Sequence, residues 1–191
     1  MSLKFIKGLI QDPQKTGAIA PSSKGLAKEL LRHWPAEKES VVVEYGSGTG
    51  AVTEEILKKI EERHFFAFEL NQMFVDELVE KFPEREFICD SATLLPEILK
   101  QKNLDSVDLI VSGLPWANFP ESLQKDLLAA TIESMSAGGT FSTFAYVHAL
   151  KLTKAKKFRE LLETIFPKVE LSPVVWKNLP PALVYHCHKA G

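Results

Sequence analysis

Strand-like and helix-like apolar patterns alternate along this chain between residues 41 and 166. The strand-like runs are VVVEY (41–45), FFAFEL (65–70), EFICD (86–90), LDSVDLIVS (104–112) and GGTFSTFAYV (138–147). Helical spacing follows them, as in NQMFVDELVEKF (71–82), where Met73 and Leu78 share the expected apolar face. Strands joined through helices pair in parallel, because each crossover returns the chain to the same edge of the sheet.

The end of the chain has a different pattern. VELSPVVWKN (169–178) and ALVYHCHK (182–189) are both strand-like, and only LPP separates them. Such a short connection has no room for a crossover helix, so these two strands must pair antiparallel. The sequence therefore predicts an α/β fold: a doubly wound, mostly parallel seven-stranded sheet with helices on both faces and a C-terminal antiparallel hairpin.

Length and composition bound the other expectations. A chain of 191 residues fits a single domain, with an N-terminal basic and helical segment (1–35) before the sheet-forming core (40–191). A net charge of −2 argues against a whole surface that binds nucleic acid. Cys89 and Cys187 stand alone, and His186 and His188 alternate away from Cys187, so no metal site is expected. No apolar run spans a bilayer and no signal peptide is visible, which favours a cytoplasmic protein.

The glycine-rich stretch EYGSGTGA (44–51) follows the first strand and opens a helix. Gly46 permits a sharp turn, Gly48 allows a ligand close to the backbone, and Gly50 lets the helix begin tightly against the strand. The same letters fit the dinucleotide fingerprint G-x-G-x-x-A, so a nicotinamide-dependent dehydrogenase remains open. Glu69, at the end of the second strand, suits the ribose of either cofactor.

Three further features favour a different cofactor. Glu44 places a carboxylate where a cationic ligand is expected, Asp90 ends the third strand, and the sheet closes with a hairpin. Together these features resemble the class I S-adenosylmethionine-dependent methyltransferases over residues 41–188. The resemblance implies a Rossmann-like fold and S-adenosyl-L-methionine as cofactor. It also implies cofactor contacts from Glu44, Tyr45, Gly46, Gly48, Gly50, Glu69, Leu70, Asp90, Ser91 and Ser112.

The loop SGLPWANFP (112–120) follows the fourth strand, and in such methyltransferases this loop faces the transferable methyl group. The resemblance therefore implies catalytic roles for Pro115 and Trp116, joined by Tyr146 at the end of the fifth strand. The loop is similar to the N-L-P-Y or D-P-P-Y loop of enzymes that methylate planar amino groups. Gly113 stands where those enzymes have an accepting side chain, which argues against a nucleobase acceptor.

Three segments, GAIAPSSKGLAKEL (17–30), SGLPWANFP and WKNLPPALVY (176–185), resemble the bacterial phospholipid N-methyltransferases. This resemblance implies methylation of an amino headgroup such as that of phosphatidylethanolamine. More distantly the chain resembles the ribosomal RNA adenine dimethyltransferases. Two alternatives stay open: a nucleic-acid methyltransferase, favoured by the basic run KLTKAKKFR (151–159), and a nucleotide-binding protein without catalysis.

An amine acceptor must be neutral before it can take a methyl group, and its product is a cation. Tyr146 is expected to orient the amine, with His148 as a candidate base. Trp116, Phe119 and Tyr146 are candidates for an aromatic cage around the cationic product.

The first fifteen residues suggest a membrane contact. Phe5, Ile6, Leu9 and Ile10 would share one side of a short helix, with Lys4 and Lys7 at its edges. Such a helix would gain order at an anionic surface. We therefore expect residues 1–15 to make a peripheral contact at the inner face of the membrane, where the phospholipid substrate lies. The alternative that this segment packs over the cofactor cleft as a lid stays open.

Overall fold

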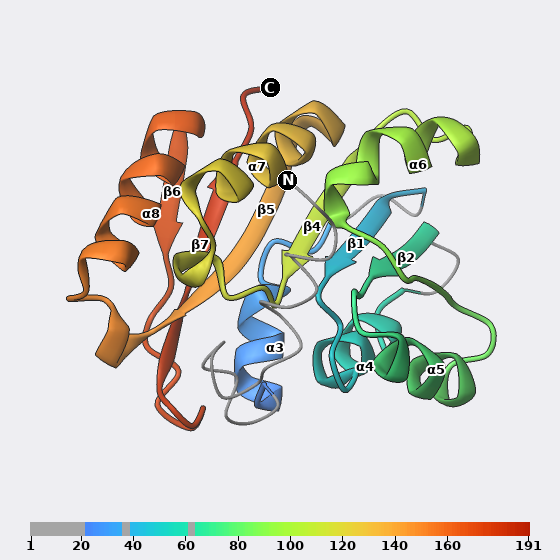
Figure 1. The fold of residues 1–191 in the computed structure, drawn as a ribbon, viewed down its shortest axis with the longest axis horizontal. Coiled ribbons are helices and arrows are strands. Elements are labelled where there is room, and N and C mark those ends of the chain that lie inside the picture. The colour runs from blue at the N-terminus through green and yellow to red at the C-terminus, as the bar shows by residue number, and fades with distance from the viewer. Residues whose placement is uncertain (1–21, 36–38, 61–63) are drawn as a thin grey trace.

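A seven-stranded sheet forms the centre of the protein (Figure 1), in a computed structural model that describes residues 22–35, 39–60 and 64–191. The strands are β1 (Val41–Tyr45), β2 (His64–Phe68), β3 (Glu86–Ile88), β4 (Val107–Ser112), β5 (Met135–Tyr146), β6 (Lys168–Leu171) and β7 (Ala182–His188). Their order is β3-β2-β1-β4-β5-β7-β6. The first five strands pair in parallel, and β7 runs antiparallel to both β5 and β6. This arrangement confirms the predicted fold, including its terminal antiparallel strands.

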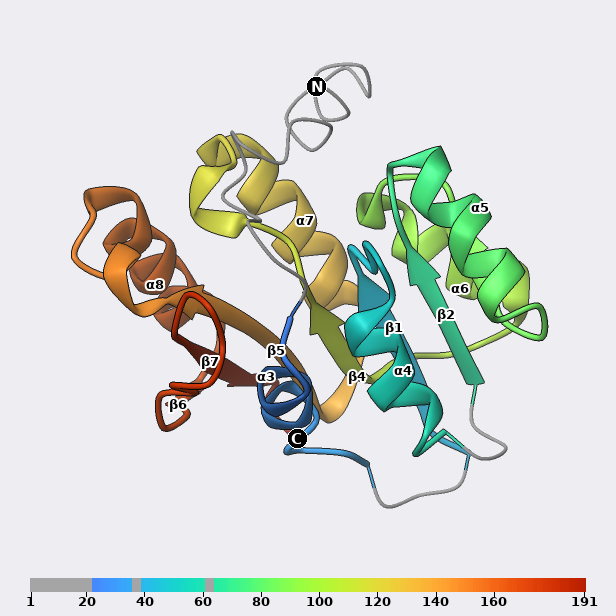
Figure 2. The ribbon, with the colours of Figure 1, turned by 90° about the horizontal axis from the view of Figure 1, so that it is seen from below.

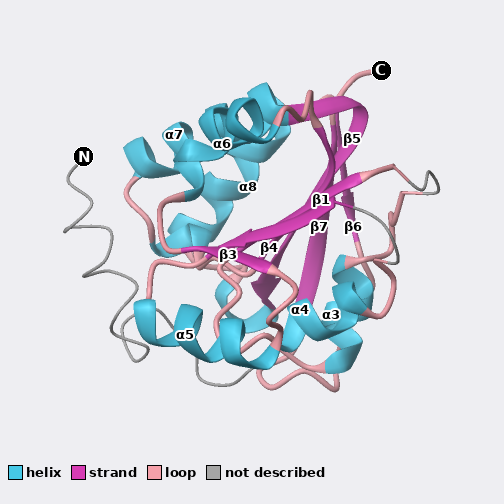
Figure 3. Ribbon diagram, turned by 90° about the vertical axis from the view of Figure 1, so that its right-hand side faces the viewer, coloured by secondary structure: helices cyan, strands magenta, loops and turns pink. Residues whose placement is uncertain are grey.

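Helices cover both faces of the sheet (Figure 3). One face carries α6 (Leu95–Lys102), α7 (Glu121–Ser134) and α8 (Thr153–Ile165), and the other carries α3 (Lys24–Leu30), α4 (Ala51–Leu57) and α5 (Gln72–Lys81). Each helix buries an apolar stripe, such as Leu123, Leu127 and Leu128 of α7. These stripes and the two faces of the sheet make two apolar clusters, one on each side.

Two expectations about these elements need correction. Leu78 is buried as expected, but Met73 is 67% exposed, because α5 turns Val75 toward the sheet in its place. Strand β5 begins at Met135, earlier than the glycines that seemed to open it, and a register shift opposite Val107 and Leu109 accommodates the extra residues.

The N-terminal helix α3 begins at a side-chain cap. The side chain of Ser23 accepts a hydrogen bond from the Leu26 amide and caps α3. The predicted membrane segment, residues 1–15, lies outside the described part of the chain and stays a prediction. Among the described helices, none is both long and apolar enough to cross a bilayer.

The strand order reverses between β1 and β4. Helices that follow these two strands lie on opposite faces, so a crevice opens outside their carboxyl ends. Tyr45 and Ser112, the last residues of the two strands, are register partners. Figure 2 shows α8 and α5 at opposite ends of the sheet, with the end of β4 between them. The loops after β1 and β4 therefore leave the sheet side by side.

Candidate active site

A cavity of about 520 Å³ lies at the carboxyl ends of the parallel strands. Of the residues expected to bind the cofactor, those that line it are Gly46, Gly48, Glu69, Leu70, Asp90 and Ser91. Of the residues expected to serve the acceptor, Pro115, Trp116 and Tyr146 also line it. The fold thus brings four separate loops to one cavity.

The glycine loop presents bare backbone to this cavity. Gly46, Gly48 and Gly50 all have positive φ angles, which disfavour any side chain. A Cβ on Gly50 would lie 2.8 Å from Leu78 Cδ2, so that glycine is needed for packing. A Cβ on Gly48 would meet no protein atom within 4 Å. The space beside Gly48 therefore fits a ligand that lies against the main chain.

Glu69 holds the glycine loop in place. Its Oε2 accepts a hydrogen bond from the Gly48 amide and its Oε1 from the Asn71 amide, both at 2.9 Å. A carboxylate has about four acceptor sites, so lone pairs remain for the two hydroxyls of a ribose. Asp90 lines the same side of the cavity, where its Oδ1 accepts from the Ser91 amide at 2.7 Å. These two carboxylates suit the hydroxyl and amino donors of an adenosine moiety.

Glu44 lies behind the cavity wall. It is 1% exposed, and its carboxylate accepts a hydrogen bond from the Thr53 hydroxyl at 2.6 Å. Burial raises the pKa of Glu44 to about 7, although the Thr53 hydrogen bond acts in the opposite direction. Glu44 thus lies under the glycine loop and does not line the cavity, so its expected contact with the cofactor stays a prediction.

Tyr45, Gly50 and Ser112 are also placed behind the cavity lining. The Tyr45 ring is fully buried, with its hydroxyl 3.3 Å from the Thr131 hydroxyl. The Ser112 hydroxyl accepts hydrogen bonds from the Trp116 indole at 2.8 Å and the Leu114 amide at 3.3 Å. These residues shape the two loops and do not line the cavity, so their expected contacts with the cofactor stay a prediction.

Trp116 is packed into the core, with only 2% of its surface exposed. Its ring stacks on Phe158 at 5.4 Å and meets Phe141 edge-on at 5.5 Å. Phe119 is likewise buried against it. Trp116 and Phe119 line the cavity but are largely covered by other side chains, so the expected aromatic cage around a cationic product stays a prediction. Trp116 borders the cavity and supports the loop from behind.

Gly113 explains the unusual first position of the GLPW loop. Its amide donates to the Tyr45 carbonyl at 2.8 Å, and a Cβ there would lie 2.7 Å from the Gly46 carbonyl oxygen. The loops after β1 and β4 thus touch through their backbones. An asparagine or aspartate has no room at this position.

The acceptor side of the cavity is largely apolar. Its wall includes Leu114, Leu123, Leu127, Phe144, Leu152 and Phe158. Tyr146 supplies a polar group there, and burial raises the pKa of its hydroxyl, which keeps it neutral. The exposed His148 stacks on Tyr146 with ring centroids 5.7 Å apart. A neutral hydroxyl beside an apolar wall suits a long acceptor that carries one polar end.

Comparison with known proteins decides the class. The chain is 30% identical over 174 residues to an ornithine lipid N-methyltransferase of Singulisphaera acidiphila, covering 89% of this chain and 86% of that enzyme. The chain belongs to the S-adenosylmethionine-dependent methyltransferases. Its cofactor is S-adenosyl-L-methionine, as the resemblance over residues 41–188 implied, and this excludes the dehydrogenase alternative. No family model matches the sequence.

Solved structures show the same fold. A TehB-like methyltransferase from Corynebacterium glutamicum superposes with a TM-score of 0.62 at 17% identity, covering 100% of both chains. The CurJ carbon methyltransferase gives a TM-score of 0.61 at 17% identity, over 84% of this chain and 51% of that one. The methyltransferase thus spans about half the length of the CurJ chain. At these identities the likeness concerns the fold alone.

Some residues that shape the site had no signal in the sequence. The buried Gln124 of α7 donates from Nε2 to the carbonyls of Trp116 (2.8 Å) and Phe119 (3.1 Å), which fixes the loop before the helix. A single glutamine on an amphipathic helix looks like any solvated residue. Thr53, which holds the Glu44 carboxylate, is equally ordinary in sequence.

We expect Glu44→Gln to make the free energy of unfolding of the methyltransferase less sensitive to pH. The pKa of Glu44 is about 7 in the folded protein against 4.5 in an unfolded chain. The folded form therefore binds the extra proton, and its stability falls as pH rises from about 4.5 through 7. Glutamine does not titrate, so the variant should not show this decrease in the free energy of unfolding, which amounts to up to about 3 kcal/mol. Urea unfolding of both proteins at pH 5 and pH 8 measures the difference, and parallel pH profiles would contradict the expectation.

Proposed function

We propose that the methyltransferase methylates the amino headgroup of a membrane lipid, such as phosphatidylethanolamine or an ornithine lipid. The observation that carries the proposal is the similarity, over most of both chains, to an enzyme named for N-methylation of a lipid. The apolar acceptor wall supports it, because a lipid brings acyl chains that need such a surface. An adenine acceptor is disfavoured by Gly113, which has no side chain to accept from its amino group.

The residues of the cofactor side fit S-adenosylmethionine. Gly48 would lie against it, while the Glu69 and Asp90 carboxylates would hold its hydroxyl and amino groups. When bound, this cofactor supplies a methyl group activated on a sulfonium sulfur.

On the acceptor side, the Tyr146 hydroxyl can accept a hydrogen bond from the amine and so orient its lone pair. His148 lies between Tyr146 and solvent, where it can take the proton that the ammonium must lose. The apolar wall excludes water around the amine.

Exposed apolar side chains lie next to the acceptor side. Leu152, which lines the cavity, is 58% exposed, and Trp176 and Leu179 in the β6–β7 connection are 70% and 74% exposed. This connection borders the site, because Pro181 accepts a hydrogen bond from the Val147 amide, next to Tyr146. The exposed lysines nearby in sequence are Lys151, Lys154 and Lys177. A tryptophan and leucines among lysines are typical of a surface that rests on anionic lipid.

The test measures methyl transfer to amine lipids, both in vesicles and as short-chain, water-soluble molecules. We expect transfer to phosphatidylethanolamine or ornithine lipid in anionic vesicles, and none to phosphatidylcholine, whose nitrogen is already quaternary. The double variant Trp176→Ser, Leu179→Ser should lose at least about tenfold in rate on vesicles, because it buries less apolar surface in the interface. It should keep its rate on a short-chain, water-soluble amine lipid.

A matched control is Met73→Ser, Val79→Ser, which removes two exposed apolar side chains from α5. This control should keep its rate on vesicles. The lipid proposal fails if neither amine lipid is methylated in either form. The proposal that Trp176 and Leu179 contact the membrane, but not the lipid proposal, fails if both double variants lose rate on vesicles by the same factor.

A further inference from the structure

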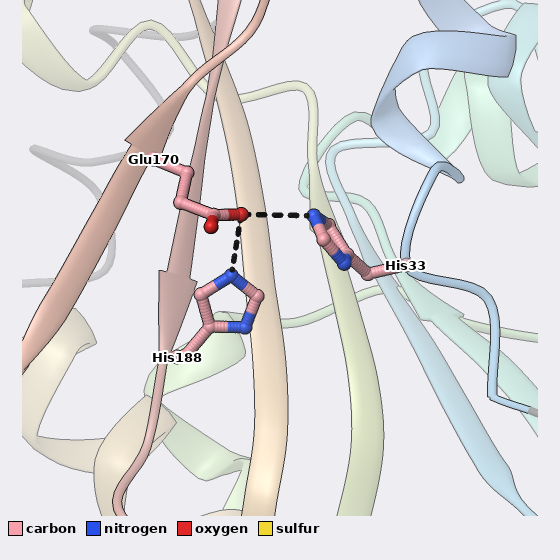
Figure 4. Close-up of side chains that lie close together, drawn as sticks. All are labelled: His33, Glu170 and His188. Carbon is pink, nitrogen blue, oxygen red and sulfur yellow. Dashed lines mark hydrogen bonds and ion pairs between the residues drawn. The ribbon is translucent and has the colours of Figure 1, made fainter.

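Three side chains from distant parts of the sequence meet at the edge of the sheet (Figure 4). His33 follows α3, Glu170 belongs to β6 and His188 ends β7. The Nε2 atoms of His33 and His188 lie 3.3 Å and 3.2 Å from the same atom, Glu170 Oε2. One ligand atom from each residue lies within 4.8 Å of the other two. Both imidazoles thus point at one carboxylate oxygen.

We propose that His33, Glu170 and His188 bind a divalent transition-metal ion of the zinc type, with water as the fourth ligand. Two histidines and one glutamate are an established ligand set for Zn²⁺. Metal–ligand bonds of about 2.0–2.1 Å in a tetrahedral site place the ligand atoms roughly 3.3 Å apart. The two observed nitrogen–oxygen separations match this spacing.

The surroundings of the cluster orient its ligands. His188 Nδ1 lies 3.1 Å from the hydroxyl of the buried Thr140, which fixes the ring and leaves Nε2 facing Glu170. Such a partner on the other ring nitrogen is usual for a histidine that binds a metal. Lys168 pairs with Glu170 Oε1 at 2.6 Å, so the second oxygen is left for the histidines.

The Nε2 atom of His33 gives independent support for a bound metal ion. This atom is buried and has no well-formed hydrogen bond within the described residues, despite lying 3.3 Å from the carboxylate. Buried polar atoms of this kind are rare and call for a partner. A metal ion between His33 and Glu170 would supply it.

The cluster is separate from the active site. His188 pairs with Thr140 in the middle of β5, whereas Tyr146, six residues further along that strand, lines the cavity. A metal there would fasten the end of α3 to β6 and β7, and thus increase the stability of the fold.

This proposal departs from the expectation that the chain has no metal site, which considered only cysteine and histidine spacing. Residues 33, 170 and 188 are brought together only by the fold.

The test uses the full, tag-free chain after chelator treatment, titrated with Zn²⁺ in a calorimeter. We expect one ion per chain and a rise in the thermal midpoint on binding. Co²⁺ should give the visible bands of a tetrahedral complex, without the charge-transfer band that a cysteine ligand would add. Glu170→Gln and His188→Gln should each weaken Zn²⁺ binding at least about tenfold.

The matched controls change an exposed glutamate and an exposed histidine elsewhere, Glu160→Gln on α8 and His64→Gln on β2. Both should bind Zn²⁺ as the parent does. Glu170 is itself partly exposed, so its variant is expected to fold. The proposal is overturned if the parent binds no stoichiometric Zn²⁺. It is also overturned if Glu170→Gln and His188→Gln bind Zn²⁺ as tightly as the parent.

Discussion

Replacing Gly48 by valine is expected to weaken S-adenosylmethionine binding at least about 100-fold, a loss of roughly 2.7 kcal/mol. The new side chain would enter the cavity at the place where the structure shows open space beside the glycine loop. Its Cβ would meet no protein atom within 4 Å, so packing in the fold does not oppose the substitution at this atom. Isothermal calorimetry with the purified variant measures the affinity.

Gly138→Val is a matched control for this experiment. Gly138 also has a positive φ, and a Cβ there would likewise meet open space, but it lies in β5 away from the cavity. Both variants carry the same kind of backbone strain, which costs about 1–3 kcal/mol of stability. Only Gly48→Val should lose affinity for the cofactor. Equal affinities in the two variants would show that Gly48 does not face the ligand.

Replacing Trp116 by alanine is expected to lower the free energy of unfolding by about 3–5 kcal/mol. The indole is buried, stacked on Phe158 and hydrogen-bonded to Ser112, so its loss leaves a cavity and removes one of the two hydrogen bonds that the Ser112 hydroxyl accepts. Chemical denaturation monitored by circular dichroism gives the stability, and methyl transfer by the remaining folded protein gives the activity.

Trp116→Phe separates support from direct contact. Phenylalanine keeps most of the packing against Phe158 but removes the hydrogen bond to Ser112, which is worth about 1 kcal/mol. If Trp116 acts by supporting its loop, this variant should keep its turnover within a few-fold. A stable Trp116→Phe protein with intact cofactor affinity and turnover reduced 100-fold or more would instead place the indole against the acceptor.

Patterns that repeat along the chain predicted the fold well. Alternating strand and helix signals predicted the parallel strands, and the antiparallel pairing of the last two strands was also predicted. The predicted strand over 169–178 was too long, because β6 ends at Leu171 and the connection to β7 covers residues 172–181. The meeting of Gly46, Gly48, Glu69 and Asp90 at one cavity was predictable for the same reason. Gly46, Gly48, Glu69 and Asp90 each follow a strand, and the carboxyl ends of parallel strands share one edge.

The sequence did not predict the features that depend on the direction in which a side chain points. Trp116 follows a strand just as Asp90 does, yet its ring turns inward because Phe141 and Phe158 leave an aromatic pocket for it. Glu44 is two residues from a glycine that lines the cavity, but it packs against Thr53. The contact between Gly113 and Gly46 joins residues 67 positions apart, and no local pattern reports it.

The proposed acceptor can be tested directly with radiolabelled S-adenosylmethionine. Purified enzyme is incubated with total lipid and, separately, with total RNA from the source cell, and the label in each fraction is counted. The Gly48→Val variant gives the background in both. We predict label in amine-containing lipids, lost in Gly48→Val, and background counts in RNA. Label in RNA with none in lipid would contradict the account.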